Sequence, residues 1–116
     1  MTTCDSAPDD QLAVAIEALR AQYLAEAPTR IAELWTEFAR VQNGDAHALP
    51  ALRTLAHRLA GSGGSYGLPD VTTCGRAMDQ FCRAVGGALP SSTQVADLRL
   101  LIQRIADAFH EASSPE

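Results

Sequence analysis

Apolar residues recur every three or four positions along most of this chain, which is the spacing that places them on one side of an α-helix. Four such series are joined by short turns, and none shows the alternation of a β-strand. Their members are Leu24, Ile31, Leu34, Trp35, Phe38 and Val41; Leu52, Leu55, Leu59, Ser62 and Tyr66; Val71, Cys74, Met78, Phe81, Cys82 and Val85; and Val95, Leu98, Leu101, Ile102, Ile105 and Phe109. The pattern predicts an all-α fold, an antiparallel up-and-down four-helix bundle.

A fifth apolar series precedes these four, after Asp9 or Asp10, either of which can cap a helix. Its members are Leu12, Ile16, Leu19 and Tyr23. Pro28 then removes one backbone donor from the chain. Either two helices abut near Ala27, or one long helix kinks there, so we expect an extra N-terminal helix that is short or kinked by proline.

Turn-forming residues divide the remainder of the chain. Asn43-Gly44-Asp45 stops the first bundle helix, Gly67-Leu68-Pro69-Asp70 marks the next boundary, and residues 86–92 form a loop that ends in a good N-cap residue. The next helix starts near Ala46–Pro50. We expect a disordered segment over residues 1–8, a single bundle over 9–112 and a disordered tail over 113–116.

The composition and charge of the chain limit the classes of partner and site that we expect. The chain has 116 residues, enough for one core, and its net charge of −5 with no lysine and no basic run argues against a nucleic-acid partner. No apolar segment is long enough to span a membrane, and the N-terminus lacks a secretory signal, so we expect a cytoplasmic protein. Three cysteines at no framework spacing (Cys4, Cys74 and Cys82) predict reduced thiols, and we expect no metal site.

The segment around His57 carries the candidate chemistry. His57 lies two residues from both Leu55 and Leu59, so its imidazole faces away from the apolar side of the helix. Its neighbours on the outer face are Arg53, Thr54, Ala60, Gly61 and Gly64. The other two histidines, His47 and His110, fall near helix ends and are interpreted as surface residues.

Glycines crowd the turn that follows His57. Gly61, Gly63 and Gly64 would together cost a helix roughly 2–3 kcal/mol relative to alanine. Close approach of another protein to the imidazole is one reason for a helix to carry that cost. Alternatively, the helix ends near Gly61 and residues 61–67 form a loop, but Tyr66 and the aliphatic series favour a helix that persists. Gly67 is then structural, because it lets the chain turn.

The pattern His57-x-Leu59-Ala60-Gly61-Ser62, with Gly67 at its end, resembles the signature of histidine-containing phosphotransfer (HPt) domains of multistep phosphorelays. The resemblance covers most of the chain. Residues 24–41 are similar to the family helix that precedes the signature, with Pro28 as its mid-helix proline. Residues 67–79 are similar to the helix that packs behind the active histidine. The family usually has lysine three residues after the histidine, where this chain has Ala60.

The resemblance implies that His57 is the phospho-acceptor, taking a phosphoryl group from a receiver-domain aspartate and passing it to another receiver. The chain would then be a phosphoryl carrier more than a stand-alone catalyst. Its partners would be receiver domains of response regulators or a hybrid histidine kinase. It would need no cofactor of its own, because Mg²⁺ belongs to the receiver, and it would be a monomer, although a bundle can dimerise.

A cation near His57 would help to stabilise the phosphorylated form. With the lysine absent, Arg53 and Arg58 are the candidates, and we expect Arg53, Thr54, Arg58, Ala60, Gly61 and Gly64 to surround the docking and phosphoryl site.

The missing lysine also supports an alternative function. In that alternative, the chain is a non-transferring HPt-like adaptor that binds a kinase or response regulator without carrying phosphate. A third hypothesis is a helical bundle with a purely structural role.

Residues 63–67 formally match the Gly-x-Ser-x-Gly element of serine hydrolases, but that element needs a preceding strand, and the sequence predicts none.

Overall fold

The computed structural model describes residues 8–113, which form five helices and no strand. These are α1 (Pro8–Ala25), α2 (Ala27–Gln42), α3 (Ala48–Ser65), α4 (Pro69–Val85) and α5 (Ser92–Ser113). The all-α prediction is therefore confirmed. Residues 1–7 and 114–116, with Cys4 and nearly all of the predicted disordered ends, lie outside the described part. Pro8 and Ser113, expected in those ends, are instead the first residue of α1 and the last of α5.

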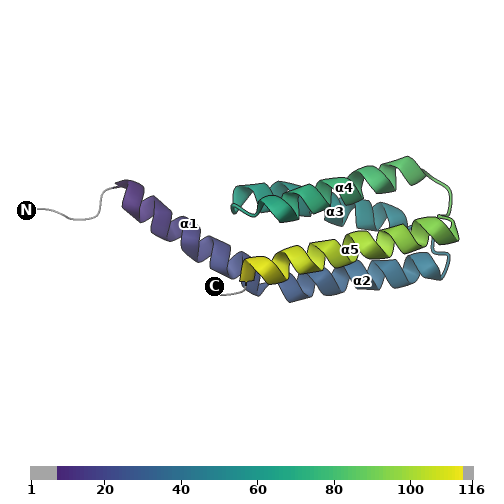
Figure 1. Ribbon diagram of the computed structural model, residues 1–116, viewed down its shortest axis with the longest axis horizontal. Coiled ribbons are helices and arrows are strands. Elements are labelled where there is room, and N and C mark those ends of the chain that lie inside the picture. The colour runs from purple at the N-terminus through teal and green to yellow at the C-terminus, as the bar shows by residue number, and fades with distance from the viewer. Residues whose placement is uncertain (1–7, 114–116) are drawn as a thin grey trace, which may run out of the picture.

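Helices α2 to α5 form the predicted antiparallel bundle (Figure 1). Each bundle helix contacts two others, so that α3 lies between α2 and α4, and α5 closes the ring between α4 and α2. The inward sides of the predicted series supply the core. Its largest fully buried side chains are Leu34, Leu52, Val71, Met78, Leu98, Ile102, Ile105 and Phe109.

The junction before the bundle consists of two helices and not one kinked helix. Helix α1 ends at Ala25 and α2 begins at Ala27, so Pro28 lies in the first turn of α2. The mid-helix proline implied by the family resemblance is therefore wrong for this chain. A proline in the first turn is tolerated because its missing N–H would have no partner within the helix anyway.

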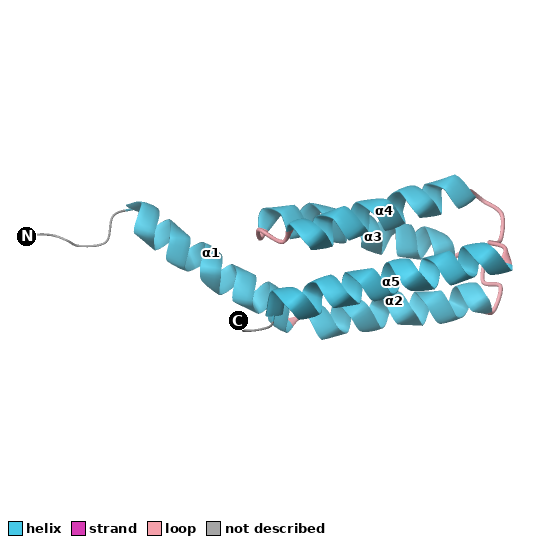
Figure 2. Ribbon diagram, in the orientation of Figure 1, coloured by secondary structure: helices cyan, strands magenta, loops and turns pink. Residues whose placement is uncertain are grey.

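Only the C-terminal end of α1 joins the bundle. Tyr23 is buried, its ring stacks on that of Tyr66 with centroids 4.6 Å apart, and its hydroxyl lies 2.5 Å from the Ser62 hydroxyl. The earlier members of the same series, Leu12, Ile16 and Leu19, are exposed. Figure 2 shows α1 extending beyond the end of the bundle. The predicted bundle over residues 9–112 therefore includes several turns that do not pack into it.

Helix α3 continues through its glycines to Ser65, so the alternative of a loop over residues 61–67 is wrong. The chain turns just after the helix at Gly67, whose φ of +71° is a backbone conformation that glycine adopts without strain. Beyond it, the Leu68 N–H donates a hydrogen bond of 2.8 Å to the Gly63 carbonyl, which satisfies one of the last carbonyls of the helix. Pro69 then begins α4, as the sequence predicts.

Candidate functional site on helices α3 and α4

Helices α3 and α4 approach each other closely along a seam of small residues. A Cβ atom on Gly75 would lie 2.9 Å from the Ala60 nitrogen and 3.0 Å from the Ala56 carbonyl oxygen. A Cβ atom on Gly63 would lie 2.9 Å from the Thr72 nitrogen. The Thr72 hydroxyl donates a 3.0 Å hydrogen bond to the Ala60 carbonyl. The glycines thus let the two backbones meet where side chains would hold them apart.

This close approach brings a carboxylate of α4 beside the imidazole of α3. Asp79 follows Gly75 by one helical turn, and its Oδ2 lies 3.2 Å from Nδ1 of His57. The His57 side chain is 71% exposed, whereas that of Asp79 is only 12% exposed. The imidazole is therefore exposed at the surface of the bundle, while its Nδ1 atom contacts the nearly buried carboxylate of Asp79.

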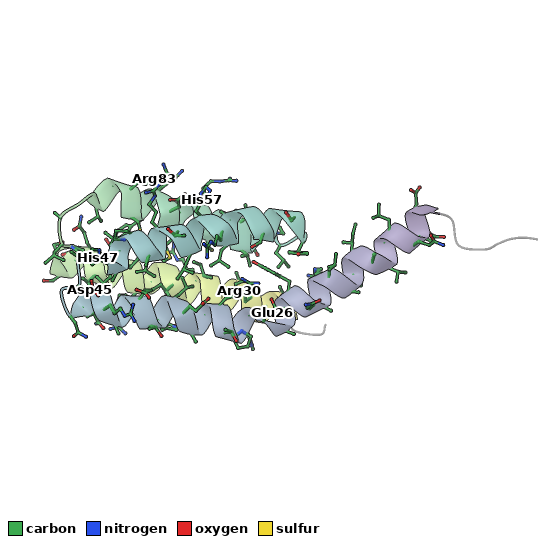
Figure 3. The ribbon with its side chains drawn as sticks, turned by 180° about the vertical axis from the view of Figure 1, so that it is seen from behind. Glu26, Arg30, Asp45, His47, His57 and Arg83 are labelled. Carbon is green, nitrogen blue, oxygen red and sulfur yellow. The ribbon has the colours of Figure 1, made fainter. Side chains whose placement is uncertain are left out.

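Two arginines share the other oxygen of the same carboxylate. Arg83 Nε lies 3.0 Å from Asp79 Oδ1, and Arg53 Nε lies 3.5 Å from it. Figure 3 shows His57 of α3 and Arg83 of α4 along the same edge of the bundle. The hydrogen bond from Arg83 lowers the pKa of Asp79, and the hydrogen bond from His57 adds to this effect against the opposing influence of desolvation.

The ionised state of Asp79 determines how the imidazole is protonated. A carboxylate can only accept hydrogen bonds, so Nδ1 of His57 must be the donor. In a neutral ring the other nitrogen, Nε2, then carries a lone pair. Because the side chain is largely exposed, this arrangement presents an oriented nucleophile to a partner that approaches α3 from solvent.

The residues expected around His57 fall on three different parts of α3. Arg53 reaches the Asp79 carboxylate, and Ala60 packs against Gly75 at the seam. Thr54 and Arg58 instead line a cavity of about 500 Å³ between α2 and α3. Arg58 therefore belongs to the α2 side of His57, and no contact joins it to Asp79.

The glycines of α3 also divide. A Cβ atom on Gly61 would meet nothing within 4 Å, and one on Gly64 would make only an ordinary contact of 3.6 Å with the Thr72 hydroxyl. These two remain compatible with close approach of a partner. Gly63 is buried against α4. The prediction that the helix accepts this glycine, despite its low helix propensity, to admit another protein is therefore wrong for Gly63. The packing of α3 on α4 requires it.

Sequence reasoning missed the roles of Asp79, Arg83 and Gly75. The three residues are spaced four apart, so they share one side of a helix. That spacing was visible, and it could have suggested a common face. The sequence did not show that this face meets the His57 side of α3, because helical periodicity carries no information about the register between two helices.

The other histidines and the cysteines of the described part do not contribute to the site at His57. His47 and His110 are exposed, and His47 precedes α3 at the end of the bundle, away from His57 (Figure 3). Burial raises the pKa of the Cys82 thiol to about 12, so this cysteine is a poor nucleophile. Within residues 8–113 no three metal-ligating side chains gather, and no helix is long and apolar enough to cross a membrane.

The chain is similar to one family of known protein domains. The model of the Hpt domain family matches residues 18–108. Since the match covers most of the chain, the protein belongs to the Hpt domain family. Hpt domains serve in histidine phosphotransfer within phosphorelays, where they interact with receiver domains and histidine kinases. Neither a curated protein nor a solved structure matches the chain.

Proposed function

We propose that this chain is a histidine phosphotransfer protein of a multistep phosphorelay, with His57 as the residue that carries the phosphoryl group. His57 accepts this group from the aspartyl phosphate of one receiver domain and passes it to the aspartate of another. The observation that supports this most directly is the exposed imidazole of His57, whose Nδ1 contacts the nearly buried Asp79 carboxylate.

The proposed transfer uses the lone pair on Nε2. An Nε2–P bond forms while the bond between phosphorus and the donor aspartate oxygen breaks, and the donor leaves as a carboxylate. Because Nδ1 keeps its hydrogen, the ring gains positive charge as the bond forms. The Asp79 carboxylate is placed to stabilise that charge and to hold the ring in one orientation. Transfer to a second receiver is the same step in reverse.

Arg53 and Arg83 supply the positive charge that the family lysine would otherwise provide. Their side chains are 49% and 54% exposed, so both can carry guanidinium N–H groups toward a phosphoryl group near His57. Their common contact with Asp79 keeps them on the α4 side of the imidazole. Replacement of the lysine by Ala60 therefore does not leave the site without cations.

The receiver is expected to dock over the exposed face of α3 and the cavity between α3 and α2. That cavity has a half-buried Leu55 and an exposed Ala32, together with Arg58 and the carboxylates of Glu33 and Glu37. Apolar surface beside charged groups is typical of a protein-binding site. In this proposal the chain is cytoplasmic, the Mg²⁺ needed for transfer is held by the receiver, and this chain carries no cofactor.

Phosphorylation by a small phosphoramidate donor tests the proposal without any partner protein. We expect the intact mass of the wild-type chain to increase by one phosphoryl group that is lost in acid. The variant His57→Gln should show no increase. His47→Gln is the matched control, because His47 is also exposed but has no carboxylate of α4 beside it, and it should behave like the wild type.

Transfer to isolated receiver domains then separates a carrier from an adaptor. Loss of radiolabelled phosphate from the chain and its gain by a receiver would support the carrier. If the wild type takes up no phosphate, or if His57→Gln takes up as much, the carrier is wrong. Receiver binding that persists in that case would favour the non-transferring adaptor, and absence of both would favour a purely structural bundle.

A further inference from the structure

Helix α1 exposes an apolar face that the bundle does not cover. The exposed fractions of Leu12, Ile16 and Leu19 are 59%, 45% and 50%. Together with Tyr23 they are spaced four, three and four residues apart, so they form one stripe along the helix. Between residues 12 and 25 the strongly polar residues are only Glu17, Arg20 and Gln22. A helix this apolar is normally buried.

The exposed part of α1 has little support from its own chain. Helix α1 meets the bundle near its C-terminal end, where it packs on α2 and α5 and where Tyr23 reaches Ser62 of α3 and Tyr66. An isolated helix shorter than about 12–15 residues is only marginally stable in water. Moreover, the Hpt family match begins at residue 18, so Leu12 and Ile16 precede the part of the chain that matches the family.

We propose that this face binds a second copy of the same chain, through an antiparallel pair of α1 helices. The alternating spacing of four and three residues is that of a coiled-coil seam. With a two-fold axis near Ile16, the two Ile16 side chains meet, and Leu12 of each chain faces Leu19 of the partner subunit. A two-fold pair of this kind is closed, so it produces dimers and not filaments.

The charges beside the stripe favour a second copy in the antiparallel orientation. Asp9 and Arg20 flank the stripe on the same side of the helix, near its opposite ends. Antiparallel pairing therefore brings Arg20 of each chain close to Asp9 of the other. In a parallel pair, Asp9 of one chain and Arg20 of the other would lie near opposite ends of the stripe, so this attraction would be lost. An anionic membrane surface fits less well, because Asp9, Asp10 and Glu17 outnumber Arg20.

The proposal departs from the monomer that the family resemblance implies, and it does not depend on the proposed phosphotransfer. The paired segment is short, so we expect a weak and reversible dimer. Sedimentation equilibrium of the full chain over roughly 5–500 μM should show monomer and dimer in exchange.

Two variants of matched charge locate the dimer interface. Ile16→Glu places two carboxylates against each other across the two-fold axis, and it should raise the dissociation constant at least about tenfold. Val14→Glu adds the same charge on the opposite side of the same helix, where Val14 is 70% exposed, and it should leave the dimer unchanged. Neither residue belongs to the buried core, so both variants should fold, and circular dichroism checks this.

Three results would overturn the proposal. The chain could sediment as a monomer at every concentration, or Ile16→Glu could dimerise as well as Val14→Glu. Alternatively, Ile16→Glu could weaken binding of a receiver domain to a chain that is monomeric throughout, which would assign the stripe to the receiver. Phosphorylation of both variants by phosphoramidate is measured in parallel, so a failure of His57 chemistry is not confused with a failure of dimerisation.

Discussion

The two sides of α3 next to His57 both contain glycine, but only one side is covered by another helix. Toward α4, Gly63 leaves room for the Thr72 backbone, and Gly75 of α4 leaves room for the backbone of α3 at Ala56 and Ala60. Toward solvent, Gly61 has no atom within 4 Å of the position of a Cβ. Similar glycines in one stretch of helix therefore serve different purposes. The atoms that an added Cβ would contact show whether a glycine is needed for packing between helices or lies on an open surface.

The largest effect is expected where the seam between α3 and α4 is tightest. In Gly75→Ala the new methyl group meets backbone atoms of Ala56 and Ala60, which cannot rotate away. The helices must separate, and we expect the free energy of unfolding in urea to fall by about 1–3 kcal/mol. Since Asp79 moves with α4, phosphorylation of His57 by phosphoramidate should also slow.

Gly87→Ala is the control for this change, because Gly87 lies in the loop before α5 and a Cβ there meets nothing within 4 Å. It should change stability by less than about 0.5 kcal/mol. If Gly75→Ala were equally harmless, the seam could open at no cost, and the account of how Asp79 is held beside His57 would be wrong.

On the solvent side of α3, replacing a glycine by alanine is expected to increase the free energy of unfolding. Gly61→Ala adds a methyl group in open space within a helix, so the free energy of unfolding should rise by about 0.8–1 kcal/mol. Phosphorylation by phosphoramidate should stay unchanged, because the small donor needs little room. Transfer from a receiver should slow if the space above Gly61 admits the partner. A loss of stability would contradict the open space at this position.

The smallest effect is a dependence of stability on pH that comes from Asp79. Its pKa is lowered in the folded chain from an ordinary value of 3.8. The resulting stabilisation is complete above that value and is lost as the pH falls through the lower folded pKa. Below about pH 4, wild-type stability in urea should therefore fall more steeply than that of Asp79→Asn.

Salt should reduce that difference, because Arg53 and Arg83 are about half exposed and surface ion pairs are screened. Identical slopes for the wild type and Asp79→Asn would show that the folded carboxylate is not stabilised by its neighbours. That result would remove the electrostatic reason to assign the hydrogen on His57 to Nδ1.

The helices, their order and the outward direction of His57 can be predicted from the amino-acid sequence alone. Apolar spacing predicts these because it depends only on the 3.6-residue period of each helix. The boundary between α3 and α4 is also predictable from local sequence. Glycine at position 67 and proline at position 69 restrict or permit backbone conformations only at their own positions and those next to them. The resemblance to the Hpt family rested on such local features, since the signature lies within one helix and the turn after it, and the family match over residues 18–108 confirms it.

The surroundings of His57 and the residues that cover each helix depend instead on how the helices pack together. Asp79 reaches the imidazole only because Gly75 and Gly63 let α4 approach α3 in one particular register. The same register places Arg83 at the site and leaves Arg58 on the α2 side. On α1, the spacing of Leu12 and Ile16 predicts an apolar face but not its partner, and this face lies outside the bundle. Register and coverage depend on contacts between residues far apart in the chain, which no local period encodes.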